Sequence, residues 1–111
     1  PAQGTGFLTP WQEKLSLNGS MWMHSLFQGR APEGQLLMSS YMGGARRPDI
    51  ATWSNQQRED VAQQELGRLL GIRGGALWHR VDHHPQALPL YHGHYSLHQQ
   101  AISNALNATP G

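Results

Sequence analysis

Cysteine is absent from the sequence, and its absence excludes several kinds of structure at once. A chain without cysteine has no disulfide framework, no thiol nucleophile and no zinc or iron–sulfur site with cysteine ligands. Long apolar runs are also missing: none approaches the roughly 18 residues that a membrane span requires, and the N-terminal residues lack the charged-then-apolar pattern of a signal peptide. We therefore expect no transmembrane segment and a cytoplasmic location.

Charged residues are scarce, at 14% of the 111 residues, whereas about a quarter is usual in globular domains. The 8 Lys and Arg residues are scattered and nearly balanced by 7 Asp and Glu residues, so no basic patch indicates a nucleic-acid partner. Disordered chains combine high net charge with few aromatic residues, but this chain has a formal net charge of +1 and 4 tryptophans. The length suits one folded domain, and we expect residues 1–111 to form it.

The 13 glycines and 7 prolines favour short elements joined by turns over a helical bundle. Short apolar or aromatic runs at residues 4–10, 20–27 and 35–42 predict three strands. The turn-rich stretch 28–34 separates the second run from the third, which makes an antiparallel pair the simplest topology. The first part of the chain is therefore predicted to form a small antiparallel sheet.

A helix is predicted to start just after Ser54. Ser54 and Gln57 fit the capping box, in which each side chain bonds the backbone N–H of the other residue. Gly71 supplies the signal for the end of the helix. The apolar residues between these signals recur at helical spacing and form one stripe: Ala62, Leu66, Leu69 and Leu70.

Two more elements are predicted in the last third of the chain. Residues 75–82 alternate between two faces, as a strand does, and residues 95–107 return to helical periodicity. Between them, Pro85 and Pro89 prevent regular strand pairing. The element order is therefore β-β-β-α-β-α, which predicts an α+β fold with a small, mainly antiparallel sheet and two helices packed on one face.

Six histidines follow one another closely in the last third of the chain: His79, His83, His84, His92, His94 and His98. His94 and His98 are four residues apart, a spacing that lets two imidazoles on one helix face share a metal ion. No Asp or Glu follows Asp82, however, so no carboxylate completes or orients such a site. We therefore predict no metal site and expect these histidines to be exposed or half-buried.

Aromatic and methionine side chains are concentrated in the second and third predicted strands. They are Met21, Trp22, Met23, Phe27, Met38, Tyr41 and Met42. Such soft, flat-sided residues suit a cleft for a large planar ligand, although a stripe of this kind is more often ordinary core. The residues alone therefore indicate a small α+β domain and leave both interpretations open.

Six short motifs follow one another in a characteristic order, and together they cover most of the chain. They are Gly4–Pro10, Gly19–Trp22, Ser25–Gly34, Tyr41–Gly44, Leu69–Ile72 and Ala87–His94. In this order the chain resembles the oxygen-dependent protoporphyrinogen oxidase family. Each motif is weak singly, and the specificity of the resemblance comes from their shared order.

This resemblance implies a flavoenzyme of the amine-oxidase type, which uses FAD and dioxygen to oxidise protoporphyrinogen IX to protoporphyrin IX in haem synthesis. The chain resembles the later part of the substrate-binding domain of that family. These 111 residues hold no Gly-x-Gly-x-x-Gly fingerprint of a dinucleotide fold. We therefore expect no FAD on this chain alone, no catalysis by it alone, and assign no catalytic residue.

The resemblance also assigns roles to four positions. Leu8, Met21 and Tyr41 match positions on the apolar faces that sandwich the tetrapyrrole in the family. His84 falls where the family usually has a tryptophan beside the flavin, so this chain departs from the pattern at the flavin edge. Full-length relatives often attach to membranes, which adds membrane association to the expected cytoplasmic location.

Two functional hypotheses follow. In the first, the chain is a fragment or stand-alone relative of the substrate-binding domain, and it self-associates or pairs with a separate flavin-binding chain because half of its cleft would otherwise be exposed. In the second, it is a non-enzymatic, oligomeric module that binds a porphyrin, haem or another flat ligand, with His92 or His94 available to a haem iron. A remnant without a biological role is the third interpretation.

Overall fold

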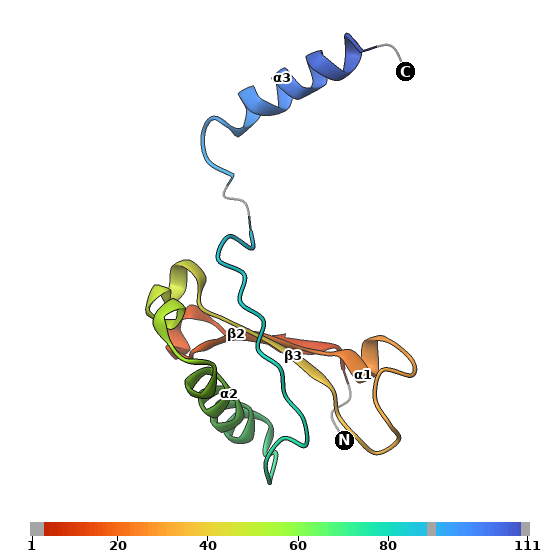
Figure 1. Ribbon diagram of the computed structural model, residues 1–111, viewed down its shortest axis with the longest axis vertical. Helices are drawn as coiled ribbons and strands as arrows, with labels where there is room; N and C mark the ends of the chain where they lie inside the picture. The colour runs from red at the N-terminus through yellow and green to blue at the C-terminus, as the bar shows by residue number, and fades with distance from the viewer. Residues whose placement is uncertain (1–3, 89–90, 110–111) are drawn as a thin grey trace.

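The computed structural model describes residues 4–88 and 91–109 of the chain. A sheet with one helix beside it occupies one end of the molecule, and helix α3 (Tyr95–Asn107) stands apart at the other end (Figure 1). The molecule is therefore elongated, with principal extents of 58, 34 and 25 Å. Residues 89 and 90, which belong to the motif Ala87–His94, lie outside the described residues.

Three short strands form the sheet, in the order β1-β2-β3. Strand β1 is Gly6–Leu8, β2 is Leu17–Trp22 and β3 is Met38–Met42. Both neighbouring pairs are antiparallel. The predicted α+β class and the antiparallel sheet are confirmed.

The second strand begins and ends earlier than its apolar run predicts. Residues 23–26 form a single helical turn, α1 (Met23–Leu26), in place of strand. The chain turns there because the backbone N–H of Met23 donates to the carbonyl of Leu37 at 2.9 Å, and the ring Nδ1 of His24 contacts the same carbonyl at 3.1 Å. These contacts join α1 to Leu37, the residue that precedes β3.

Helix α2 (Asn55–Leu70) begins and ends at the signals that the sequence provides. The hydroxyl of Ser54 accepts from the Gln57 N–H at 3.2 Å, and the Gln57 side chain accepts from the Ser54 N–H at 2.8 Å. Gly71 ends the helix with φ +67°, a left-handed conformation that glycine adopts at little cost. This helix prediction is confirmed at both ends.

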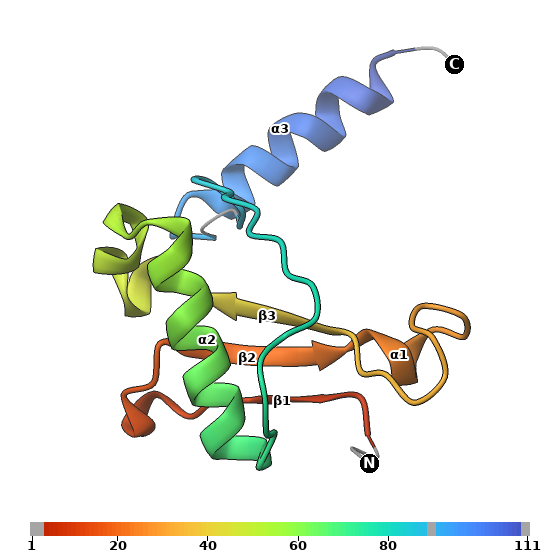
Figure 2. The same ribbon diagram turned by 60° about the horizontal axis from the view of Figure 1, so that its bottom comes forward.

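A small core lies between the sheet and α2, which crosses one face of the sheet (Figure 2). Its buried apolar side chains are Leu15, Leu17, Trp22 and Ile50. Ile50 comes from the 3₁₀ helix η3 (Pro48–Thr52), which follows the shorter 3₁₀ helix η2 (Gly44–Arg46) and leads into α2. The core is small because one face of the sheet and all of α3 remain uncovered.

Two details differ from the predicted arrangement. Residues 75–82 are not a strand: they pair with no sheet strand and instead run beside α2. Helix α3 has the predicted bounds, but it does not pack on the sheet, since Leu97, Ile102 and Leu106 are 60%, 60% and 68% exposed. Alternation and helical periodicity show which side of a segment is apolar, but they do not specify what covers it.

Candidate ligand-binding face

The face of the sheet opposite α2 is open, and its residues are fixed by the strand register. Leu8 of β1 lies opposite Gly19 of β2, and Gly19 lies opposite Tyr41 of β3. Met21 follows Gly19 by two residues, so its side chain leaves the sheet on the same side. Leu8, Met21 and Tyr41 are 86%, 42% and 52% exposed. The structure thus brings the three predicted residues together on one face, which we call the open face.

The alternating residues of the same strands face α2. Ser20 and Trp22 are only 2% and 8% exposed, and the hydroxyl of Ser40 donates to that of Ser20 at 3.0 Å. On β3, Met38 and Met42 alternate with Tyr41 and are half-buried. The sequence left core and ligand cleft open for the methionine and aromatic stripe. In the structure, part of the stripe is core and part is exposed on the open face.

Gly19 leaves room for the Leu8 side chain at the centre of the open face. A Cβ atom at Gly19 would lie 2.6 Å from the carbonyl oxygen of Phe7 and 2.9 Å from Cδ2 of Leu8. The Leu8 side chain therefore lies over a position that only glycine leaves vacant. On the other side of Gly19, the Tyr41 hydroxyl donates to Sδ of Met21 at 3.4 Å, which holds the two side chains against each other. The result is a smooth, mostly apolar surface.

A bulge in β2 sets this register. Leu17 lies opposite Met42, whereas Gly19 lies opposite Tyr41, so Asn18 is the additional residue. Its Nδ2 donates to the carbonyl of Gly43 at 3.0 Å, just beyond β3. If the same residues paired without the bulge, Asn18 would lie opposite Tyr41, and Met21 would no longer share a face with Tyr41.

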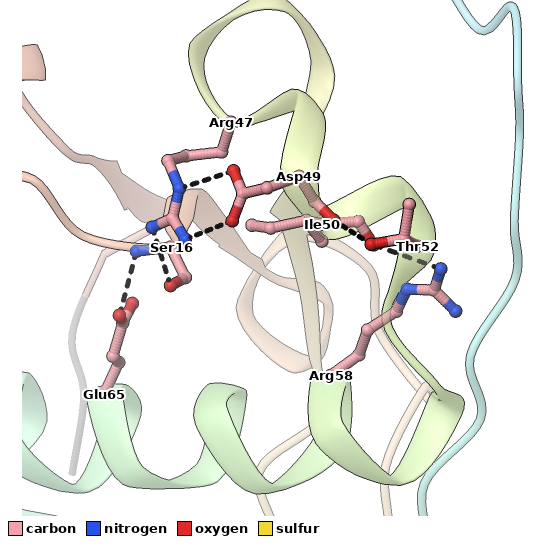
Figure 3. A network of polar contacts seen from close by, with 7 residues as sticks. All are labelled: Ser16, Arg47, Asp49, Ile50, Thr52, Arg58 and Glu65. Carbon is pink, nitrogen blue, oxygen red and sulfur yellow. Dashed lines mark hydrogen bonds and ion pairs between the residues drawn. The ribbon is translucent and has the colours of Figure 1, made fainter.

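The network that joins α2 to the sheet is built around Glu65 (Figure 3). Its two carboxylate oxygens accept from the backbone N–H groups of Ser16 and Leu17, at 2.8 and 2.9 Å. These groups lie at the start of β2, so Glu65 fixes the strand against the helix. The sequence reasoning missed this residue, although one signal was available: Glu65 falls at helical spacing within the apolar stripe, three residues after Ala62 and one before Leu66.

Arg47 extends the network to η3 (Figure 3). Its guanidinium donates to the Ser16 hydroxyl at 3.2 Å and to both carboxylate oxygens of Asp49, at 2.9 and 2.6 Å. The hydrogen bonds from Arg47 lower the pKa of Asp49, and the same bonds raise the pKa of Arg47. Folding lowers the pKa of Asp49, so the pair stabilises the fold at pH values above the ordinary pKa of an aspartate. This contribution is lost as the pH falls through the lowered pKa of Asp49 in the folded chain.

His84 does not join the open face. It lies in the irregular segment after α2 and is exposed. His94, His98 and the described histidines around them are also exposed, and His94 caps α3 through its carbonyl, which accepts from the His98 N–H at 3.3 Å. Among residues 4–88 and 91–109, no three His, Cys, Asp or Glu side chains gather as metal ligands would.

The open face offers contact area but little chemistry. Leu8, Met21 and Tyr41 supply apolar and aromatic surface, with no carboxylate, imidazole or thiol among them. Two hollows of the described surface lie beside α2 instead, one of them lined by Trp53, Gln57, Asp60 and Val61. A flat ligand would therefore lie on the open face as on a wall, and a second surface would have to close the site.

Comparison with known proteins defines the class. The flavin-containing amine oxidoreductase family matches residues 2–106, and the chain belongs to this family. It is 30% identical to protoporphyrinogen oxidase 2, chloroplastic/mitochondrial, of Arabidopsis thaliana and 28% identical to mitochondrial protoporphyrinogen oxidase of Nicotiana tabacum. It is 24% identical to coproporphyrinogen III oxidase of Bacillus subtilis strain 168. The resemblance to protoporphyrinogen oxidases is confirmed.

These relatives are much longer than the chain. The alignments cover 100%, 100% and 98% of this chain, but only 22%, 23% and 23% of the three relatives, in the same order. The chain therefore spans less than a quarter of the length of the curated relatives it matches. No helix within the described part of the chain is both long and apolar enough to cross a membrane.

Proposed function

We propose that the open face is one wall of the tetrapyrrole site of a protoporphyrinogen oxidase, which converts protoporphyrinogen IX to protoporphyrin IX. The observation that supports this most is the row Leu8–Gly19–Tyr41 across three strands, with Met21 beside it. The family resemblance assigns Leu8, Met21 and Tyr41 to the tetrapyrrole faces independently of the strand register. They nevertheless lie on one exposed sheet face and not in the core.

The shape of this face fits the proposed substrate class. A tetrapyrrole presents a broad apolar surface, and it would contact the Leu8 side chain, which covers Gly19, together with Met21 and Tyr41. Burying a fully exposed leucine or aromatic side chain contributes about 1.5–3 kcal/mol. Leu8, at 86% exposed, and Tyr41, at 52%, have most of this contribution still available for a ligand.

FAD does not fit this chain as a resident cofactor. Binding a pyrophosphate calls for a glycine-rich turn that leads into a free helix N-terminus, but the N-terminus of α2 is already closed by its own capping box. The flavin therefore belongs to a part of the enzyme outside these residues, and the chain contributes binding surface. His84, which is exposed beyond α2, is our candidate for a residue at the flavin edge.

The uncovered surfaces favour a partner. The open face and the apolar side chains of α3 are both exposed, and stable domains rarely leave so much apolar surface in water. We infer that a flavin-binding part covers them in the working enzyme, and that the isolated chain self-associates through the same surfaces. The names of the Arabidopsis and tobacco relatives place those proteins in chloroplasts or mitochondria, while the cytoplasmic location of this chain stays a prediction.

Titration of the 111-residue chain with protoporphyrin IX tests the proposed function. We expect quenching of tryptophan fluorescence that saturates, and an affinity about tenfold weaker in Leu8→Ala, a loss equivalent to about 1.4 kcal/mol of apolar contact. Leu77→Ala is a matched control, because Leu77 is 87% exposed but lies off the sheet. Equal affinities of the two variants, or no binding by the unaltered chain, would contradict the proposal.

Haem distinguishes the second hypothesis, a non-enzymatic haem-binding module. If the face binds the macrocycle, haem and protoporphyrin should bind with similar affinity, and His92→Ala or His94→Ala should change neither. Binding of haem alone, with a Soret band that either histidine substitution abolishes, would show an iron-ligating module instead.

A further inference from the structure

Residues 72–82 form a strap that runs back along α2 and approaches the helix at three positions (Figure 2). The carbonyl of Ile72 lies beside Gly67, where a Cβ atom would be 3.4 Å from it. One turn earlier on the helix, the Gln63 side chain accepts from the Ala76 N–H at 3.3 Å. One turn earlier again lies Glu59. Its Oε2 is 2.9 Å from Nε2 of His79.

These three helix positions are spaced by four residues, so they lie on one side of α2. The strap therefore follows a track along the helix, antiparallel to it. Residues 75–82 alternate in sequence but form no strand: the Ala76 N–H donates to the Gln63 side chain, and Glu59 contacts the side chain of His79. Two of the three are polar contacts, and of these the one between His79 and Glu59 depends on charge.

The charged groups next to Glu59 and His79 in the sequence bond to other partners. The side chain of Glu59 is 12% exposed and that of His79 is 52% exposed. On α2, the neighbouring Arg58 donates to the carbonyls of Ile50 and Ala51, and Asp60 accepts from Gln56. On the strap, Arg80 pairs with Asp82 at 2.8 Å. The charge of the carboxylate is thus balanced by the imidazole when the imidazole is protonated.

We propose that His79 is a pH-dependent latch that holds the strap on α2. A largely buried carboxylate is costly unless an opposite charge pairs with it, so an imidazolium at His79 stabilises the docked strap. Histidine is the side chain whose charge ordinarily changes between about pH 5 and 8. The pair of His79 and Glu59 is an ion pair only with a protonated imidazole, and a neutral imidazole leaves a single hydrogen bond to the carboxylate, which is weaker. The strap is then released more often.

Release of the strap has a consequence beyond α2. The strap connects α2 to the segment that leads to α3, and residues 83–109 contain no Asp, Glu, Lys or Arg that would tether them by charge. The position of α3 relative to the sheet therefore depends on whether the strap is docked. This inference does not rest on the proposed function, since it uses contacts on the opposite side of the sheet from the open face.

Hydrogen exchange of the Ala76 amide, measured by NMR on the full chain and expressed as a protection factor, tests the latch. The protection factor corrects for the intrinsic pH dependence of exchange, and the amide is protected only when the strap is docked on Gln63. We expect protection about threefold lower at high pH than at low pH across the titration of histidine, as loss of a partly exposed ion pair allows. Amides in the middle of α2 should show no such change.

Variants separate the latch from a general effect of pH. Glu59→Gln and His79→Gln each remove one charge, so we expect both to abolish the pH dependence of Ala76 protection. His83→Gln removes an exposed histidine of the next segment and should leave the pH dependence intact. Unchanged protection across the pH range in the original chain, or a preserved pH dependence in His79→Gln, would overturn the proposal. Because His79 is half-exposed, that variant is expected to fold even if Glu59→Gln does not.

Discussion

Replacing Glu65 by alanine is expected to lower the free energy of unfolding by about 2–4 kcal/mol. The substitution removes the acceptor of two backbone N–H groups, those of Ser16 and Leu17, which lie 2.8 and 2.9 Å from the carboxylate. Each part-buried donor left without a partner costs about 1–3 kcal/mol, and water entering the site offsets some of the sum. Urea unfolding followed by circular dichroism measures the difference.

Two further variants test the reason for that loss. Glu65→Gln keeps one good acceptor oxygen, so its free energy of unfolding should lie between those of the original chain and Glu65→Ala. Gln64→Ala changes the neighbouring exposed position of α2 and should alter stability by no more than about 0.5 kcal/mol. If Glu65→Ala and Gln64→Ala were equally stable, the carboxylate would not anchor β2 to the helix.

Replacing Leu17 by alanine is expected to cost about 2–5 kcal/mol, the usual range for a buried leucine that leaves a cavity. Leu17 is completely buried, and the core around it has few other apolar side chains to fill the space. Leu8→Ala is the matched control, since the same substitution at an 86% exposed position should change stability by no more than about 0.5 kcal/mol. Thermal or urea unfolding of the two variants side by side gives the comparison.

This pair also separates the two faces of the sheet. Leu17→Ala should weaken folding, whereas Leu8→Ala should weaken protoporphyrin binding and leave folding intact. A large loss of stability in Leu8→Ala would mean that another part of the molecule covers the open face. In that case the exposed leucine would be core, and the proposed ligand wall would not exist.

Local signals in the sequence predicted the elements they control. The capping box of Ser54 and Gln57 and the stop at Gly71 depend on residues within one turn, so the bounds of α2 could be predicted. The periodicity of residues 95–107 predicted α3 in the same way. The turn-rich stretch 28–34 correctly implied an antiparallel pair between the strands on either side of it.

Contacts between distant segments could not be predicted from the same signals. Residues 75–82 alternate as a strand would, but the partners of Ala76 and His79 are side chains of α2, which lie 13 and 20 residues earlier in the sequence. The apolar stripe of α3 predicted a packed helix, although no surface of the described chain covers it. The position of Glu65 in the apolar stripe did not show its partners, because these are backbone N–H groups 48 and 49 residues away.

The residues of the candidate site were predicted from the sequence, but their position on one face of the sheet was not. Composition and spacing left a ligand cleft and ordinary core both open, and the resemblance assigned Leu8, Met21 and Tyr41 to the tetrapyrrole faces. Their common face depends on the bulge at Asn18, whose side chain bonds the carbonyl of Gly43. A one-residue irregularity of this kind is not visible in the sequence, and the sharing of a face therefore required the structure.

The most direct test of the account is the position of bound protoporphyrin IX, observed through the methyl groups of the 4 methionines. With these methyl groups labelled with ¹³C, a macrocycle on the open face should shift the Met21 methyl signal strongly upfield through its ring current. Met38 and Met42 alternate with Tyr41 and face α2, so their signals should move little. Shifts at Met38 and Met42 without one at Met21, or no shift at any methionine, would contradict a tetrapyrrole wall at the open face.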